Sequence, residues 1–126
     1  MVFGKHLILD ISGCDLKLIK SRENLQQFVD RLCADNGMQK VGETIFKYFE
    51  DNEFNREKDI VGFTILQIIS LSSITIHICE GSLTAYIDFF TCGELHVDDV
   101  KKLVKIYFNP KRVFKKLIER DALKIS

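Results

Sequence analysis

Residues 73–79 alternate strictly between polar and large apolar side chains. The apolar positions are Ile74, Ile76 and Ile78, and the polar positions between them are Ser73, Thr75 and His77. A period of two places these sets on opposite faces, so the pattern predicts a half-buried β-strand. Glu80-Gly81-Ser82 is a turn signal, and residues 83–91 follow as the returning strand. The chain therefore contains an antiparallel hairpin with one face in a core.

Other segments predict the rest of one domain. Ser21 can cap a helix that runs to about Asn36, and a second helix is predicted from Val97 to about Phe108. Residues 50–59 carry seven charges and are predicted to form a solvated loop. Further strands are expected at residues 5–11, 41–49 and 112–118, together with the apolar run 60–69. The predicted fold is α+β: one antiparallel sheet with two helices packed on one face, a two-layer sandwich over residues 1–126.

Composition restricts the partners and the compartment. Eighteen Lys and Arg residues balance eighteen Asp and Glu residues, so charge gives no case for a nucleic-acid or membrane partner. No apolar run approaches the roughly 18 residues that cross a bilayer, and the first strand leaves no room for a signal peptide. A cytoplasmic protein is expected. Its four cysteines are then expected to be reduced, and their spacing fits no zinc site, so no metal is predicted.

Centring the hairpin on Gly81 predicts which residues face each other. Residue numbers that sum to about 162 pair, which sets Phe90 opposite Ser72. Cys92 then becomes a diagonal neighbour of Ser72 on the same face, roughly 7–8 Å away. His77 has the opposite parity to Ser72, so the peptide bond before Ser72 is expected in a strained bend. Taken singly, such serine, histidine and cysteine residues are more often a turn residue, a solvated imidazole and a small buried hydrophobe.

Two segments of the chain run from Leu71 to His77 and from Asp88 to Gly93 (Asp88-Phe89-Phe90-Thr91-Cys92-Gly93). Together they resemble the bacterial and archaeal S-adenosylmethionine decarboxylase proenzymes. The first segment is similar to that family's processing site and the second to its second motif. The resemblance implies that Ser72 Oγ attacks the Leu71 carbonyl, that His77 assists elimination, and that the chain splits into 1–71 and 72–126. Ser72 would become a pyruvoyl cofactor that forms a Schiff base with the substrate, and Cys92 would return a proton.

The same resemblance implies a substrate, but the chain departs from the family at several positions. Leu71 and Ser73 stand where the family usually has Glu and His, and Cys79 and Glu80 replace an aromatic residue and a carboxylate one residue later. Candidate substrate-binding positions are Phe49, Glu80, Thr64, which lies where the family often has a processing serine, and Lys5. The expected reaction is decarboxylation of S-adenosylmethionine for spermidine synthesis by a homo-oligomer of processed protomers. Two alternatives stay open: an arginine or ornithine decarboxylase that uses Glu80 for the distal cation, and an unprocessed, inactive paralogue that regulates an active partner.

Overall fold

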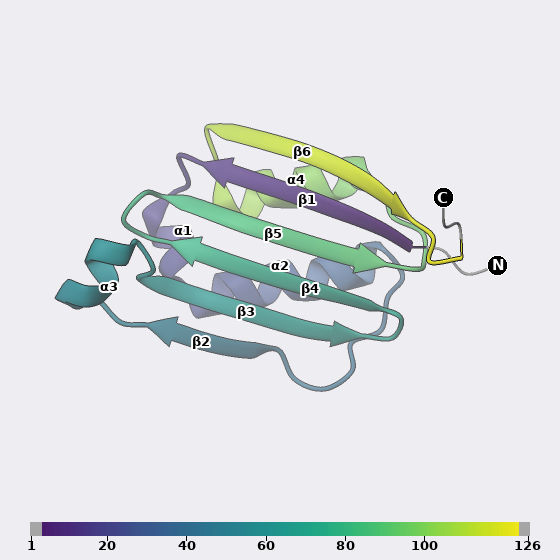
Figure 1. The fold of residues 1–126 in the computed structure, drawn as a ribbon, viewed down its shortest axis with the longest axis horizontal. Coiled ribbons are helices and arrows are strands. Elements are labelled where there is room, and N and C mark those ends of the chain that lie inside the picture. Colours follow the sequence, from purple (N-terminus) through teal and green to yellow (C-terminus); the bar gives the residue numbers. More distant parts are fainter. Residues whose placement is uncertain (1–3, 124–126) are drawn as a thin grey trace.

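The computed structural model describes residues 4–123, which form one six-stranded antiparallel sheet backed by helices (Figure 1). The strand order is β2-β3-β4-β5-β1-β6. The strands are β1 (Gly4–Ser12), β2 (Ile45–Phe49), β3 (Gly62–Ile69), β4 (Ser72–Cys79), β5 (Thr84–Thr91) and β6 (Arg112–Arg120). The helices are α1 (Leu16–Lys20), α2 (Arg22–Asp35), α3 (Glu53–Lys58) and α4 (Val97–Phe108). The α+β class and the two-layer arrangement are confirmed.

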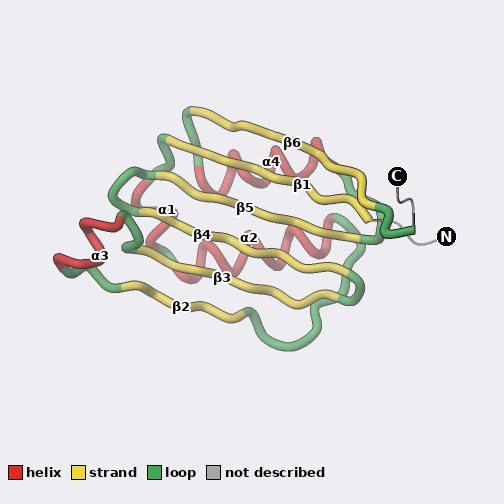
Figure 2. Tube along the Cα trace, in the orientation of Figure 1, coloured by secondary structure: helices red, strands yellow, loops and turns green. Residues whose placement is uncertain are grey.

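The two long helices begin and end where the sequence predicts. The Ser21 hydroxyl accepts a hydrogen bond from the Asn24 N–H, which caps α2, and α2 is followed by Gly37 at φ +64°. Asp98 and Asp99 lie in the first turn of α4, where carboxylates favour the positive end of the helix dipole. Helices α1, α2 and α4 lie behind the sheet in Figures 1 and 2 and leave the other face uncovered.

The core lies between this helical layer and the sheet. The isoleucines of the alternating strand, Ile74, Ile76 and Ile78, are buried against the helices. From the helices, Phe28 and Phe108 meet edge to face, with ring centroids 4.9 Å apart. Fully burying one such side chain contributes about 1.5–3 kcal/mol, so this apolar face fixes which side of β4 turns inward.

The predicted secondary structure needs correction at three places. Strand β2 covers only residues 45–49, because residues 41–44 leave the sheet after an isolated bridge between Lys40 and Ile69. The segment predicted as a loop contains α3, whose first turn is capped by the Asn52 side chain. The short helix α1, capped by Asp15, was not predicted, so four helices are present in the described chain instead of two.

The predicted hairpin register is wrong by one residue. Cys79 pairs with Thr84, so the link between β4 and β5 has four residues, and Ser72 lies directly opposite Thr91 rather than Phe90. In a sheet, a shift of one residue moves side chains to the other face. Ser72 and Thr91 therefore share the helix-covered face, while Phe90 lies on the uncovered one.

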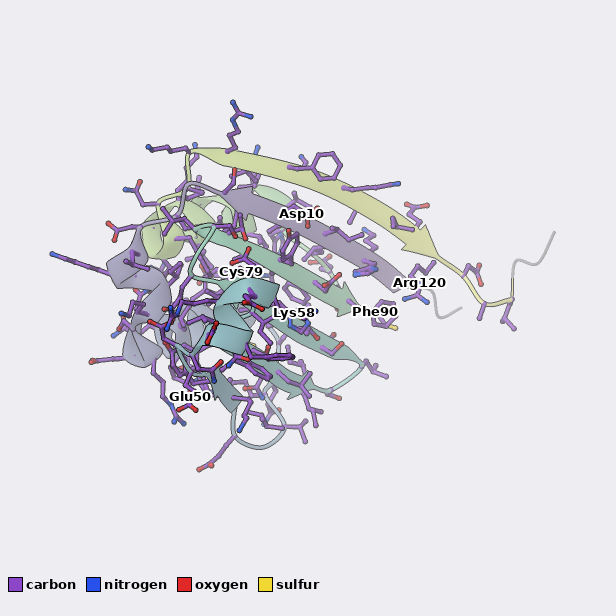
Figure 3. All side chains as sticks on the ribbon, turned by 60° about the vertical axis from the view of Figure 1, so that its left-hand side comes forward. Asp10, Glu50, Lys58, Cys79, Phe90 and Arg120 are labelled. Carbon is purple, nitrogen blue, oxygen red and sulfur yellow. The ribbon has the colours of Figure 1, made fainter. Side chains whose placement is uncertain are left out.

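The uncovered face mixes polar and large apolar side chains. Ile68, Tyr86 and Phe114 are exposed there. Figure 3 shows Phe90 beside Arg120, whose guanidinium lies 5.1 Å from the ring centroid. Among residues 4–123, no helix is both long enough and apolar enough to cross a bilayer.

Candidate active site

The bond between Leu71 and Ser72 lies in a tight bend. Strands β3 and β4 are joined by Ser70 and Leu71 alone, and Ile69 pairs with Ser72 across the turn. Leu71 has φ +59°, a left-handed conformation that costs a non-glycine residue of order 1 kcal/mol or more. The predicted bend is confirmed, and it lies at the bond that the resemblance marks for cleavage.

Two hydrogen bonds fix the groups on either side of this bond. The Ser72 Oγ–H donates to Thr91 Oγ1 at 2.8 Å. The backbone N–H of Cys92 donates to the carbonyl oxygen of Leu71 at 3.1 Å. A donor on a carbonyl oxygen stabilises the negative charge that develops there when a nucleophile attacks the carbon. The Ser72 hydroxyl and the Leu71 carbonyl are thus both held by the same segment, the end of β5 and the residue after it.

A cavity of about 770 Å³ opens over this bend. It is lined by residues 34–39 at the end of α2, residues 70–72 of the bend, and residues 91–94 and 96 after β5. This volume is typical of small-molecule sites. The predicted position of Cys92, diagonal to Ser72 within the hairpin, is wrong, because Cys92 follows β5 and its N–H is hydrogen-bonded to the Leu71 carbonyl. Ser72 and Cys92 nevertheless line the same cavity.

His77 and Thr64 lie together, away from this cavity. They are directly opposite on β4 and β3, and Thr64 Oγ1 is 3.2 Å from His77 Nδ1. Both side chains are on the uncovered face of the sheet, whereas Ser72 is on the covered face. Five residues of extended strand also separate His77 from Ser72 by about 17 Å. The structure therefore does not bring His77 to Ser72 within one chain.

The remaining candidates are divided between the two ends of the sheet. Lys5 lies on the covered face beside Thr91, its partner on β5, so it is two strands from Ser72, about 10 Å away. Phe49 and Glu80 lie near the other end of β4, about 26 Å from Ser72 along the strand. Glu80 lines a second cavity of about 290 Å³, and its Oε2 is buried without a hydrogen-bond partner among the described residues.

The four cysteines differ in their surroundings. Burial raises the pKa of the Cys14 and Cys33 thiols to about 11. Burial also raises the pKa of Cys79, which lies at the end of β4 far from Ser72. Cys92 is partly exposed and is the cysteine that lines the larger cavity. Its position, rather than its sequence spacing alone, singles it out as the thiol that can reach a ligand near Ser72.

Sequence reasoning missed two residues of the site. Thr91 was seen as part of a motif but was given no role, although it binds Ser72. His96 lines the cavity at the start of α4, where its backbone N–H donates to the Asn36 side chain. Thr91 was missed because the predicted register of the hairpin placed Phe90, and not Thr91, opposite Ser72.

Known proteins are similar to this chain over almost its whole length. A sequence model of the S-adenosylmethionine decarboxylase family matches residues 5–121. The chain belongs to this family. It is 27% identical over 121 residues to the S-adenosylmethionine decarboxylase proenzyme of Clostridium botulinum, covering 96% of this chain and 93% of that protein. The proenzyme of Archaeoglobus fulgidus is 26% identical over 107 residues, which are 85% of each chain.

A solved structure supports the fold of this family member independently. The adenosylmethionine decarboxylase of Aquifex aeolicus superposes with a TM-score of 0.78 at 21% identity, covering 99% of this chain and 96% of that one. The family is an enzyme family, and the term proenzyme in the names of the relatives fits a precursor that matures by cleavage.

Proposed function

We propose that this protein is a self-processing decarboxylase of S-adenosylmethionine that cleaves itself between Leu71 and Ser72 and supplies a step of spermidine synthesis. The observation that carries the proposal is the hydrogen bond from the Cys92 N–H to the Leu71 carbonyl oxygen, beside the Ser72 hydroxyl. A peptide bond with a polarised carbonyl, a neighbouring hydroxyl and a left-handed residue before it is suited to rearrangement.

The cleavage begins with an acyl shift. Ser72 Oγ bonds to the carbonyl carbon of Leu71, the peptide C–N bond breaks, and the nitrogen gains the proton that the hydroxyl loses. The resulting ester is then removed by elimination: a base takes the Ser72 Cα proton, and the Cβ–Oγ bond breaks, leaving Leu71 as a carboxylate. Hydrolysis of the remaining dehydroalanine releases ammonia and completes the conversion of residue 72.

The residues present fit a pyruvoyl group at position 72. Ser72 lines the cavity, so a group formed there is open to a ligand, and Cys92 lines the same cavity. The pyruvoyl group supplies a ketone that captures an amine and an amide carbonyl that accepts electrons. Cys92 Sγ–H is the proton donor to the α-carbon after CO₂ leaves, because Cys92 is the cysteine that lines this cavity.

The substrate is tested by measuring CO₂ release from S-adenosylmethionine, arginine and ornithine on the same cleaved preparation. We expect S-adenosylmethionine to give the highest kcat/KM, because the match to the S-adenosylmethionine decarboxylase family spans residues 5–121. A kcat/KM that is tenfold higher for arginine or ornithine, equal to about 1.4 kcal/mol, would show that S-adenosylmethionine is not the preferred substrate. It would not contradict the proposed cleavage.

His77 requires a second copy of the chain in this proposal. Its imidazole is on the uncovered face, about 17 Å along the strand from Ser72 in its own chain. The exposed side chains of Ile68, Tyr86 and Phe114 make that face suitable for burial against a partner. In a two-fold dimer packed through these faces, we place His77 and Thr64 of each protomer against the backbone of the other protomer's bend, where the elimination removes the Ser72 Cα proton. The Ser72 side chain itself stays on the covered face.

Mixing two inactive variants tests this arrangement. Ser72→Ala has no nucleophile, and His77→Ala is expected to stall at the ester, which hydroxylamine cuts and an amide resists. In equal co-expression, random pairing places about half of all His77→Ala chains in mixed dimers with Ser72→Ala chains. These His77→Ala chains meet an intact His77 and should be cleaved. No cleavage in the mixture would exclude action across the dimer. Light scattering that shows an active monomer would exclude the dimer itself.

A further inference from the structure

We infer that the Thr91 hydroxyl is a positioning group for self-cleavage, which aligns the Ser72 hydroxyl and the Cys92 N–H on either side of the bond to be broken. The inference rests on the proposed cleavage between Leu71 and Ser72 and adds a residue to it. Thr91 does not react in this scheme; it acts through the two groups that it holds.

Thr91 is completely buried at the end of β5, directly opposite Ser72. Its Oγ1 accepts two hydrogen bonds, from the Ser72 Oγ–H at 2.8 Å and from the Gly93 N–H at 2.8 Å. A hydroxyl oxygen has two lone pairs, so both are occupied by these donors. Because Thr91 is fully buried, both donors would lose this partner if the hydroxyl were removed.

The bond from Ser72 sets the direction of its hydroxyl. With the proton pointing at Thr91, this contact leaves the lone pairs of Ser72 Oγ unengaged, and one of them can approach the Leu71 carbonyl carbon. The β-branched Thr91 side chain is stiff about χ1, so it holds the serine oxygen in a narrow range of positions. A group held close to its attack geometry reacts faster than a freely rotating one.

The bond from Gly93 sets the direction of the carbonyl donor. It closes a turn through Thr91, Cys92 and Gly93, of the kind in which a threonine hydroxyl binds the backbone two residues on. The N–H inside this turn is that of Cys92, which donates to the Leu71 oxygen at 3.1 Å. One oxygen atom therefore couples the attacking hydroxyl to the donor that stabilises the attacked carbonyl.

The role of Thr91 is confined to cleavage. When the ester is eliminated, Ser72 Oγ leaves as part of the Leu71 carboxylate, so Thr91 no longer has its partner. A substitution that removes the threonine hydroxyl must then slow cleavage much more than it slows turnover by protomers that are already cleaved. A purely structural residue would not separate these two rates.

The test compares Thr91→Val with Thr91→Ser in refolded, initially uncleaved protein, followed by intact mass over time. We expect Thr91→Val to slow cleavage at least about tenfold, Thr91→Ser to stay near wild type, and turnover per cleaved protomer to change by less than about threefold. Thr84→Val is the matched control, since Thr84 is on the same strand and shares a 2.8 Å hydroxyl contact with Ser82 far from the bend. It should cleave normally.

Several results would overturn the inference. Cleavage of Thr91→Val at the wild-type rate would do so, and so would an equal loss of cleavage and turnover. If valine prevents folding, Thr91→Ala provides the same comparison with a smaller side chain, alongside its melting temperature. A wild-type chain that never cleaves would overturn the proposed function as well, whereas the other results leave it intact.

Discussion

Ser72→Ala is expected to remain a single chain of 14.6 kDa under conditions in which the wild type yields two. Alanine has no hydroxyl, so the Leu71 carbonyl carbon loses the nucleophile that the proposed acyl shift needs. The effect should be all or none, because the nucleophile is part of the chain. Intact-mass spectrometry in denaturant measures it, and the fragment that begins at residue 72 should resist N-terminal sequencing.

The neighbouring serine supplies a matched control for that experiment. Ser73 lies on the uncovered face of β4 and pairs with Phe90 rather than Thr91, so Ser73→Ala should cleave like wild type. Cleavage of Ser72→Ala would mean that a different bond reacts. A wild-type chain that stays whole after long incubation would favour the inactive paralogue, consistent with Leu71 in place of the glutamate that relatives usually have.

Cys92→Ala is expected to cleave normally and to lose turnover by about 10²–10⁴-fold. The two roles of Cys92 use different atoms. Its backbone N–H, which alanine retains, donates to the Leu71 carbonyl, whereas its side chain carries the thiol that we propose returns the proton after CO₂ leaves. The measurement is CO₂ release per cleaved protomer, with the cleaved fraction determined by mass in the same sample.

A substitution at Cys79 tests whether the expected loss of turnover is specific to Cys92. Cys79 is also partly exposed but lies at the opposite end of β4, so Cys79→Ala should change neither cleavage nor turnover. Normal turnover by Cys92→Ala would assign the proton to another donor. His96 would then be the first residue to test, because its imidazole lines the same cavity.

The elements with strong periodic patterns were predictable, and the turns between them were not. The apolar stripe and first-turn acids of α4 define its bounds, and alternation defines β4. The register failed because Leu83, at φ +55°, closes a four-residue link without the glycine that usually marks a left-handed position. Asp59, at φ +53°, similarly ends α3 inside a segment whose charges indicated only solvent exposure.

In the candidate site, too, the features that follow from strand periodicity were predictable and those that depend on turns and packing were not. Parity correctly set Ser72 and His77 on opposite faces and placed a bend between Leu71 and Ser72, because these follow from strand geometry alone. The contact with Thr91 depends on register, and the cavity depends on how the end of α2 approaches the sheet. Neither is encoded in the spacing of nearby residues.

The strand order decides what becomes of the protein once the bond is cut. Strand β1 belongs to the first fragment, yet it lies between β5 and β6, which both belong to the second. The two fragments also pair between β3, which belongs to the first, and β4, which belongs to the second. Strands of the two fragments therefore alternate in the sheet, and the fragments can separate only by breaking three ladders of backbone hydrogen bonds. The proposed cleavage would create new chain ends in the bend while the sheet that holds them persists, so we expect the two fragments of a protomer to stay paired without a covalent link.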